Sequence, residues 1–208
     1  MKKVLHNNLK SYMVIFLIGI IAGVICRMAD YCPSDTLWSF SSIQTLFGFW
    51  IISNTLIVLL SSSNVCAGVS SFLYMFGMTI SFYLLKYLLG FFIPIFSGEF
   101  MMSLFIIYSI LAVGCGAGAF ILYYWEKNIS VNSILYALPT GVLLAEAIAV
   151  SNYLIKNSTF LFQLIMNGVA VWIFGVWFFK MAKNRIVYIV SIGVVTSVVY
   201  VVIYRPFL

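Results

Sequence analysis

The sequence predicts an all-α polytopic membrane protein, a transmembrane helical bundle of about seven spans forming a single domain over residues 1–208. Of its 208 residues, 64% are hydrophobic and only 8% are charged, whereas soluble domains average about 45–50% apolar and about 25% charged residues. Such a chain cannot cover a water-facing surface, and the low charge density also excludes disorder and nucleic-acid binding. Continuous apolar runs, rather than alternating segments, favour helices over a barrel.

Seven apolar stretches approach the length of about 20 residues that a helix needs to cross about 30 Å of hydrocarbon. They cover approximately residues 11–26, 37–60, 65–89, 101–125, 133–155, 160–179 and 186–204. The first stretch has the basic start of a signal peptide but lacks an A-x-A-like cleavage site after it, so we expect it to remain as a helix.

The basic residues predict a cytoplasmic N-terminus. In that orientation the cytoplasmic side carries Lys2, Lys3, Lys10, Lys127, Lys180, Lys183 and Arg185, and the outer side carries Arg27, Lys86, Lys156 and Arg205. This excess agrees with the positive-inside rule, so the net charge of +6 reflects membrane topology rather than an anionic partner. We expect a multi-pass protein of the cell (cytoplasmic) membrane, with the lipid bilayer as a partner.

The available side chains predict that the protein is not an enzyme and holds no metal or other cofactor. The only histidine, His6, lies in the N-terminal tail, which removes His-dependent zinc, haem and nucleophile chemistry. Both aspartates, Asp30 and Asp35, fall in one loop, and the four cysteines form no C-x-x-C motif. Cys26 and Cys32 could pair on an oxidising outer side or remain single packed thiols.

The loops are too short for a nucleotide-binding domain, and the chain contains no G-x-x-x-x-G-K-[ST] phosphate loop. Any process driven by ATP would therefore require a separate ATPase partner.

Glu146, near the middle of the fifth span, is the sharpest single-residue signal. An ionised acid at that depth costs from about 2.5 kcal/mol upward, so it should face the bundle interior or a cavity, where burial favours its neutral form. Asn167 on the sixth span and Gln44 on the second fall at a similar depth, and Gln163 lies four residues before Asn167 on the same face. Pro139, two turns before Glu146 on the same face, is a candidate hinge. This polar layer is either a solute-binding or proton-coupling site or a set of interhelical hydrogen bonds.

Two pairs of glycines at small-xxx-small spacing predict close helix packing. Gly19 and Gly23 lie in the first span, and Gly114 and Gly118 lie in the fourth. The absence of side chains lets helix backbones approach each other, either within the chain or in a dimer.

Several short patterns spread over roughly the first 150 residues carry a resemblance. They are Gly19-x-x-x-Gly23, Leu37-Trp38, Gly48-Phe49-Trp50 and the run Gly-Val-Leu-Leu-Ala-Glu at 141–146. In these patterns the chain resembles a family of small polytopic bacterial membrane proteins of unknown function. The resemblance implies a bacterial cytoplasmic membrane and implies no activity.

Two functions fit these observations. The first is a small-solute transporter, or the substrate-binding membrane subunit of one, in which Glu146 couples protons or contacts the solute. The alternative is a non-catalytic accessory protein for assembly, immunity or sensing, packed against a membrane-protein partner.

Overall fold

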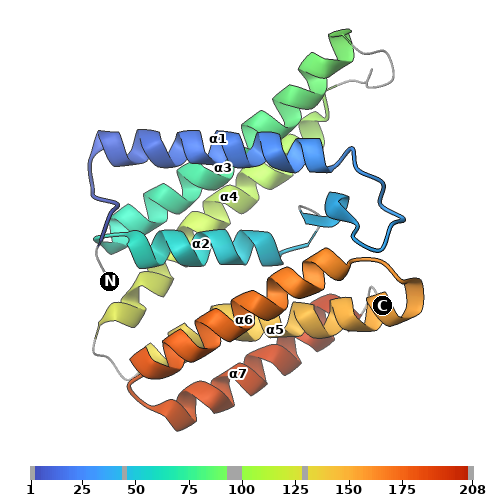
Figure 1. Cartoon of the computed structure of the whole chain (residues 1–208). Coiled ribbons are helices and arrows are strands. Elements are labelled where there is room, and N and C mark those ends of the chain that lie inside the picture. Colours follow the sequence, from blue (N-terminus) through green and yellow to red (C-terminus); the bar gives the residue numbers. More distant parts are fainter. Residues whose placement is uncertain (1–2, 44–45, 93–99, 128–130, 206–208) are drawn as a thin grey trace. The chain divides into compact units, whose positions relative to one another are not determined.

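Every element of regular structure that the computed structural model describes is a helix. It describes residues 3–43, 46–92, 100–127 and 131–205, and one isolated bridge joins Leu5 to Ser61. The α-helices are α1 (Leu9–Ala29), α2 (Gly48–Leu60), α3 (Asn64–Phe92), α4 (Met102–Leu122), α5 (Asn132–Asn157), α6 (Leu161–Met181) and α7 (Arg185–Val199) (Figure 1). Short 3₁₀ helices η1 (Phe40–Ile43) and η3 (Tyr123–Glu126) precede α2 and follow α4, and a π-helical turn η4 (Tyr200–Tyr204) extends α7.

Within the described residues, six helices are long and apolar enough to cross a membrane: α1, α3, α4 continued by η3, α5, α6, and α7 continued by η4. Their bounds match six of the seven predicted spans to within a few residues. The all-helical fold is therefore confirmed, and its composition is compatible with a multi-pass membrane protein.

The second predicted span, over residues 37–60, is wrong as one continuous helix. Its described part contains only η1 and the 13-residue α2, which at 1.5 Å per residue is about 20 Å long. The segment before α2 is rich in hydroxyl side chains that bond nearby carbonyls instead of supporting a helix. The Ser39 hydroxyl donates to the carbonyl oxygens of Ser34 and Thr36, and Ser39 itself has a positive φ of 42°.

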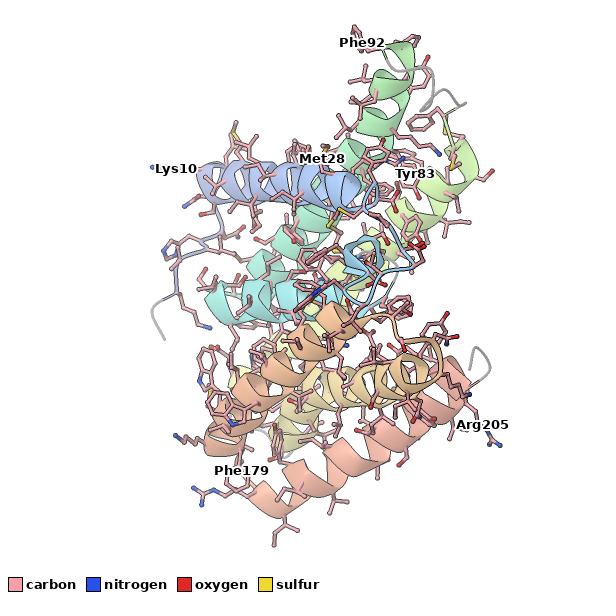
Figure 2. All side chains as sticks on the ribbon, turned by 45° about the vertical axis from the view of Figure 1, so that its right-hand side comes forward. Lys10, Met28, Tyr83, Phe92, Phe179 and Arg205 are labelled. Carbon is pink, nitrogen blue, oxygen red and sulfur yellow. The ribbon has the colours of Figure 1, made fainter. Side chains whose placement is uncertain are left out.

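The contacts divide the chain into two compact units. The first unit comprises Met1–Tyr31 and Leu56–Tyr123, and the second comprises Cys32–Thr55 and Tyr124–Leu208. In the first unit α3 packs against both α1 and α4. Figure 2 shows Lys10 and Met28 near the two ends of α1.

Gly19 and Gly23 bring α1 against α3. A Cβ added at Gly19 would overlap the Tyr74 carbonyl oxygen, and one at Gly23 would overlap Ser81 Oγ and the Met78 carbonyl oxygen. At the end of α1, Arg27 forms an ion pair of 2.7 Å with Asp30. The first unit is therefore assembled by direct approach of two helix backbones.

In the second unit α5 packs against both α6 and α7, as the ribbons show (Figure 1). Most of the α5 span is buried, 67% against 28% for α6 and 11% for the α7 span. Trp125, Tyr136 and Phe178 form an aromatic cluster, with ring centroids 5.0–5.3 Å apart. Helix α5 is therefore the core of this unit, and it carries Glu146.

Candidate functional site

Glu146 is completely buried in the second unit and receives four hydrogen bonds. Its Oε1 accepts from the Gly48 backbone N–H at 2.9 Å, from Gln163 Nε2 at 2.7 Å and from Asn167 Nδ2 at 2.9 Å. Its Oε2 accepts from the Tyr204 hydroxyl at 2.6 Å. We call Gly48, Gln163, Asn167 and Tyr204 the donor cage. All four donors are neutral groups, so no charged side chain of the cage pairs with the carboxylate.

The donor cage draws on three helices besides α5. Gln163 and Asn167 lie one turn apart on α6 and so share a face, and Gln163 Nε2 also lies 3.5 Å from Asn167 Oδ1. Gly48 is the first residue of α2, so its N–H has no intrahelical acceptor. The partial positive charge at a helix N-terminus favours an anion there. Glu146 therefore caps α2 from another helix.

Gly48 is required by the closeness of this contact. A Cβ at that position would overlap Asn167 Oδ1, Glu146 Oε1 and Gln163 Nε2. The Gly48 backbone can approach the carboxylate because glycine has no Cβ.

A helix start and a π-helical turn contribute to the donor cage. Helix α2 begins at the cage, and Tyr204 belongs to the π-helical turn η4, a feature that occurs frequently at functional sites. Pro139 is buried two turns before Glu146 inside α5, which remains helical through it. Near this proline, Thr196 Oγ1 donates to the Gly141 carbonyl oxygen at 3.1 Å, tying α7 to α5.

Three of the four predicted polar residues meet in this site. Glu146, Gln163 and Asn167 are fully buried and bonded to one another, and Gln44 lies outside the described residues. Tyr204 was not among the predicted residues, because it is 58 residues from Glu146 and has no distinctive spacing. The role of Gly48 was not predicted either, although a glycine inside an apolar run indicates a break or a close approach.

The two glycine pairs differ. Gly19 and Gly23 pack against α3 in the manner described above, whereas added Cβ atoms at Gly114 and Gly118 would meet no atom within 4 Å. In the fourth helix it is Gly116 that packs, against the backbone of Gly68 on α3. The expectation of packing at Gly114 and Gly118 therefore finds no contact among the described residues. Cys26 and Cys32 are both free thiols.

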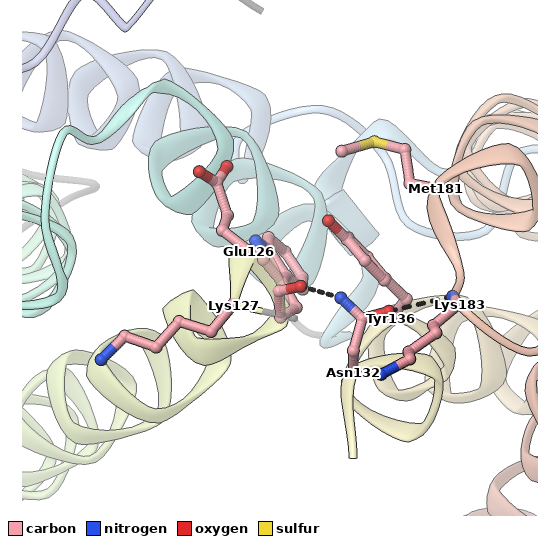
Figure 3. Close-up of a pocket in the computed structure, with 7 residues that line it drawn as sticks. Glu126, Lys127, Asn132, Tyr136, Met181 and Lys183 are labelled. Atoms are coloured by element: carbon pink, nitrogen blue, oxygen red, sulfur yellow. Dashed lines mark hydrogen bonds between the residues drawn. The ribbon is translucent and has the colours of Figure 1, made fainter. Parts of the chain in front are cut away.

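A second polar feature of this unit is a cavity of about 380 Å³ at the start of α5 (Figure 3). It is lined by Trp125, Glu126, Lys127, Asn132, Tyr136, Met181 and Lys183. Asn132 connects two of its walls, donating to the Trp125 carbonyl oxygen and accepting from the Lys183 backbone N–H at 3.2 Å. The Lys127 ammonium lies over the Tyr124 ring, 4.4 Å from its centroid, and makes a cation–π contact with it.

The part of the chain that the structure describes contains no group of three or more His, Cys, Asp or Glu residues placed to hold a metal ion. Comparison with known proteins gives no matching family model, no matching curated protein and no matching solved structure. Fold and site thus define an apolar helical protein, compatible with several membrane passes, that contains a buried carboxylate capping a short helix.

Proposed function

We propose that the protein is a proton-coupled transporter of a small solute, or the solute-binding membrane subunit of a transporter, with Glu146 as the proton-binding group. The observation that carries the proposal is the complete burial of this carboxylate at the N-terminus of a short helix. Transporters commonly place solute and ion sites where a membrane helix is discontinuous and a helix terminus points at an anionic group. An intramembrane acid also indicates a functional site by default.

The coupling follows from the chemistry of the cage. A carboxylate accepts all four hydrogen bonds, whereas a neutral acid must place a proton on one oxygen and is a weaker acceptor. Protonation therefore weakens the bond from Glu146 to the Gly48 N–H and frees the start of α2. Proton binding and movement of α2 are linked in this way, and we infer a non-enzymatic role in a bacterial cytoplasmic membrane.

The test is proton movement in proteoliposomes that contain an internal pH-sensitive dye. Neutral, cationic and anionic small metabolites are added one class at a time, and solute-dependent acidification is expected for one class. Glu146→Gln should abolish it while leaving the unfolding temperature nearly unchanged, because the amide can keep most of the hydrogen bonds. Tyr200→Phe is the matched control, since the Tyr200 hydroxyl accepts from Asn152 and not from the cage. Full activity of Glu146→Gln would contradict the proposal.

The open face of α4 favours one alternative, a non-catalytic accessory protein. A Cβ added at Gly114 or Gly118 would meet no described atom within 4 Å outside the adjacent backbone of α4 itself, and close approach of a partner helix is one use of such small residues. Native mass spectrometry of the gently extracted protein separates the two functions. A stoichiometric membrane-protein partner lost in Gly114→Leu, without any bound solute, would favour the accessory role, and a nucleotide-binding partner would favour a transport subunit.

A further inference from the structure

We propose that the donor cage is a binding site for a small carboxylate ligand, and that Glu146 occupies it in this structure as an internal substitute for that ligand. This deepens the proposed function, on which its role in transport rests, by naming the class of solute. The binding itself requires no transport and can be tested separately.

The arrangement of donors is that of an anion site. Three N–H groups converge on one carboxylate oxygen at 2.7–2.9 Å, and a hydroxyl reaches the other at 2.6 Å. One of the three is the first N–H of a helix, where backbone donors and the helix dipole both favour an anion. The donors carry no net charge, which suits a single negative charge. A second carboxylate cannot enter beside Glu146 because of like-charge repulsion, so it must replace it.

An independent observation indicates that the ligand brings a donor as well. Gln163 Oε1 is completely buried, and no group in the described residues donates a hydrogen bond to it. Buried acceptors in proteins are nearly always satisfied. A hydroxyl or amino group next to the ligand carboxylate would satisfy this oxygen. The ligand class is therefore a small hydroxy- or amino-carboxylate, of which glycolate is the simplest probe.

Exchange between the side chain and the ligand accounts for coupling. A proton that binds Glu146 makes it a weaker acceptor, and the ligand carboxylate then takes the four donors, so one proton accompanies one carboxylate. Among the residues that the structure describes, the titratable group bonded to Glu146 is Tyr204 of η4. Tyr200 packs nearby, against Ala145 and Ala149, with its hydroxyl bonded to Asn152.

The test uses the full-length Glu146→Ala variant in nanodiscs. This substitution removes the atoms of an acetate ion from the cage, so added acetate can replace them. Sodium acetate and sodium glycolate should raise the unfolding temperature saturably relative to sodium chloride at equal ionic strength, and glycolate should act at lower concentration. No carboxylate-specific stabilisation would overturn the site, and equal potency of the two ions would overturn the role of Gln163 Oε1.

A matched pair of double variants tests whether the ion sits in the cage. Tyr204→Phe combined with Glu146→Ala removes one donor and should weaken acetate binding about tenfold or more. Tyr200→Phe combined with Glu146→Ala removes a hydroxyl from the same π-helical turn and should leave acetate binding unchanged. Equal weakening in both would overturn the assignment.

A second variant covers a failure of Glu146→Ala to fold. In that case recovery of monodisperse protein only when acetate is present is the expected result, and Glu146→Gln, whose neutral amide is displaced more easily, should be stabilised by glycolate more than the wild type. Failure of both would overturn the proposal. If that happens while a non-carboxylate solute drives proton flux, the transport function is supported without the carboxylate site. If acetate binds but no solute drives proton flux, the carboxylate site is supported without the transport function.

Discussion

The two compact units join their helices by different means. In the first unit Gly19 and Gly23 let α1 approach the backbone of α3 until no Cβ would fit between them. In the second unit a carboxylate on α5 gathers donors from α2, α6 and η4. The glycine contact is made with backbone atoms of Tyr74 and Met78 and with Ser81 Oγ. In the proposed function one proton changes the hydrogen bonding of the donor cage, so we expect any switchable function in the second unit.

The largest effect that would test this contrast is expected from Glu146→Ala. The four donors of the cage lose their acceptor, and buried unsatisfied donors cost about 1–3 kcal/mol each, though not additively. We expect the free energy of unfolding, measured by denaturant titration in mixed micelles, to fall by about 3 kcal/mol or more. Glu146→Gln should lose less than about 1 kcal/mol. Equal losses in both variants would mean that the charge itself is needed for folding.

The glycine contact of the first unit should be the next most sensitive. Gly23→Ala places a Cβ against the Met78 backbone, which cannot move without shifting α3, and overpacking of this kind costs about 1–3 kcal/mol. Gly118→Ala is the matched control on a face with no atom within 4 Å. It should be neutral, or stabilising by up to about 1 kcal/mol, since alanine favours a helix more than glycine. If Gly118→Ala lowered the free energy of unfolding as much as Gly23→Ala, then Gly118 would have a packing partner in the folded protein, contrary to this expectation.

The corresponding change in the second unit is Gly48→Ala. Its Cβ would overlap the ends of three side chains rather than backbone, and because side-chain ends can move, we expect a smaller loss of about 1–2 kcal/mol. Movement of those side-chain ends opens the cage. We therefore expect a large loss of proton flux in proteoliposomes together with this small loss of stability. Gly168→Ala on α6, with no atom within 4 Å, serves as the control. Unchanged proton flux in Gly48→Ala would mean that the start of α2 takes no part in proton coupling.

The smallest change in stability is expected from Tyr204→Phe. It removes one hydrogen bond to Glu146 Oε2 and should cost about 1 kcal/mol. Tyr200→Phe removes a hydroxyl bonded to Asn152 instead and should cost a similar amount. Only Tyr204→Phe should alter proton flux. If both variants altered it equally, the π-helical turn rather than the cage would be responsible.

Much of the site follows from spacing along the helices. Adjacent antiparallel spans of known rise place Glu146 and Asn167 at one depth, and helix periodicity places Gln163 on the same face as Asn167. All three are bonded in the structure. The Gly19 and Gly23 packing followed from the same periodicity. Gly114 and Gly118 have identical spacing without a described contact, because spacing identifies a face of a helix but not what lies opposite it.

The sequence by itself determined the all-helical class, because its continuous apolar runs and 8% charged residues favour helices, which satisfy their backbone groups internally. It also determined that a single acid would be buried in α5. Only the tertiary structure decided that the second apolar stretch breaks before Gly48 and that Tyr204 completes the cage. Despite its hydroxyl side chains, the segment before Gly48 is apolar enough to be predicted as part of one span. The partners of a buried carboxylate depend on which helices pack together, and a separation of 58 residues along the chain does not indicate that packing.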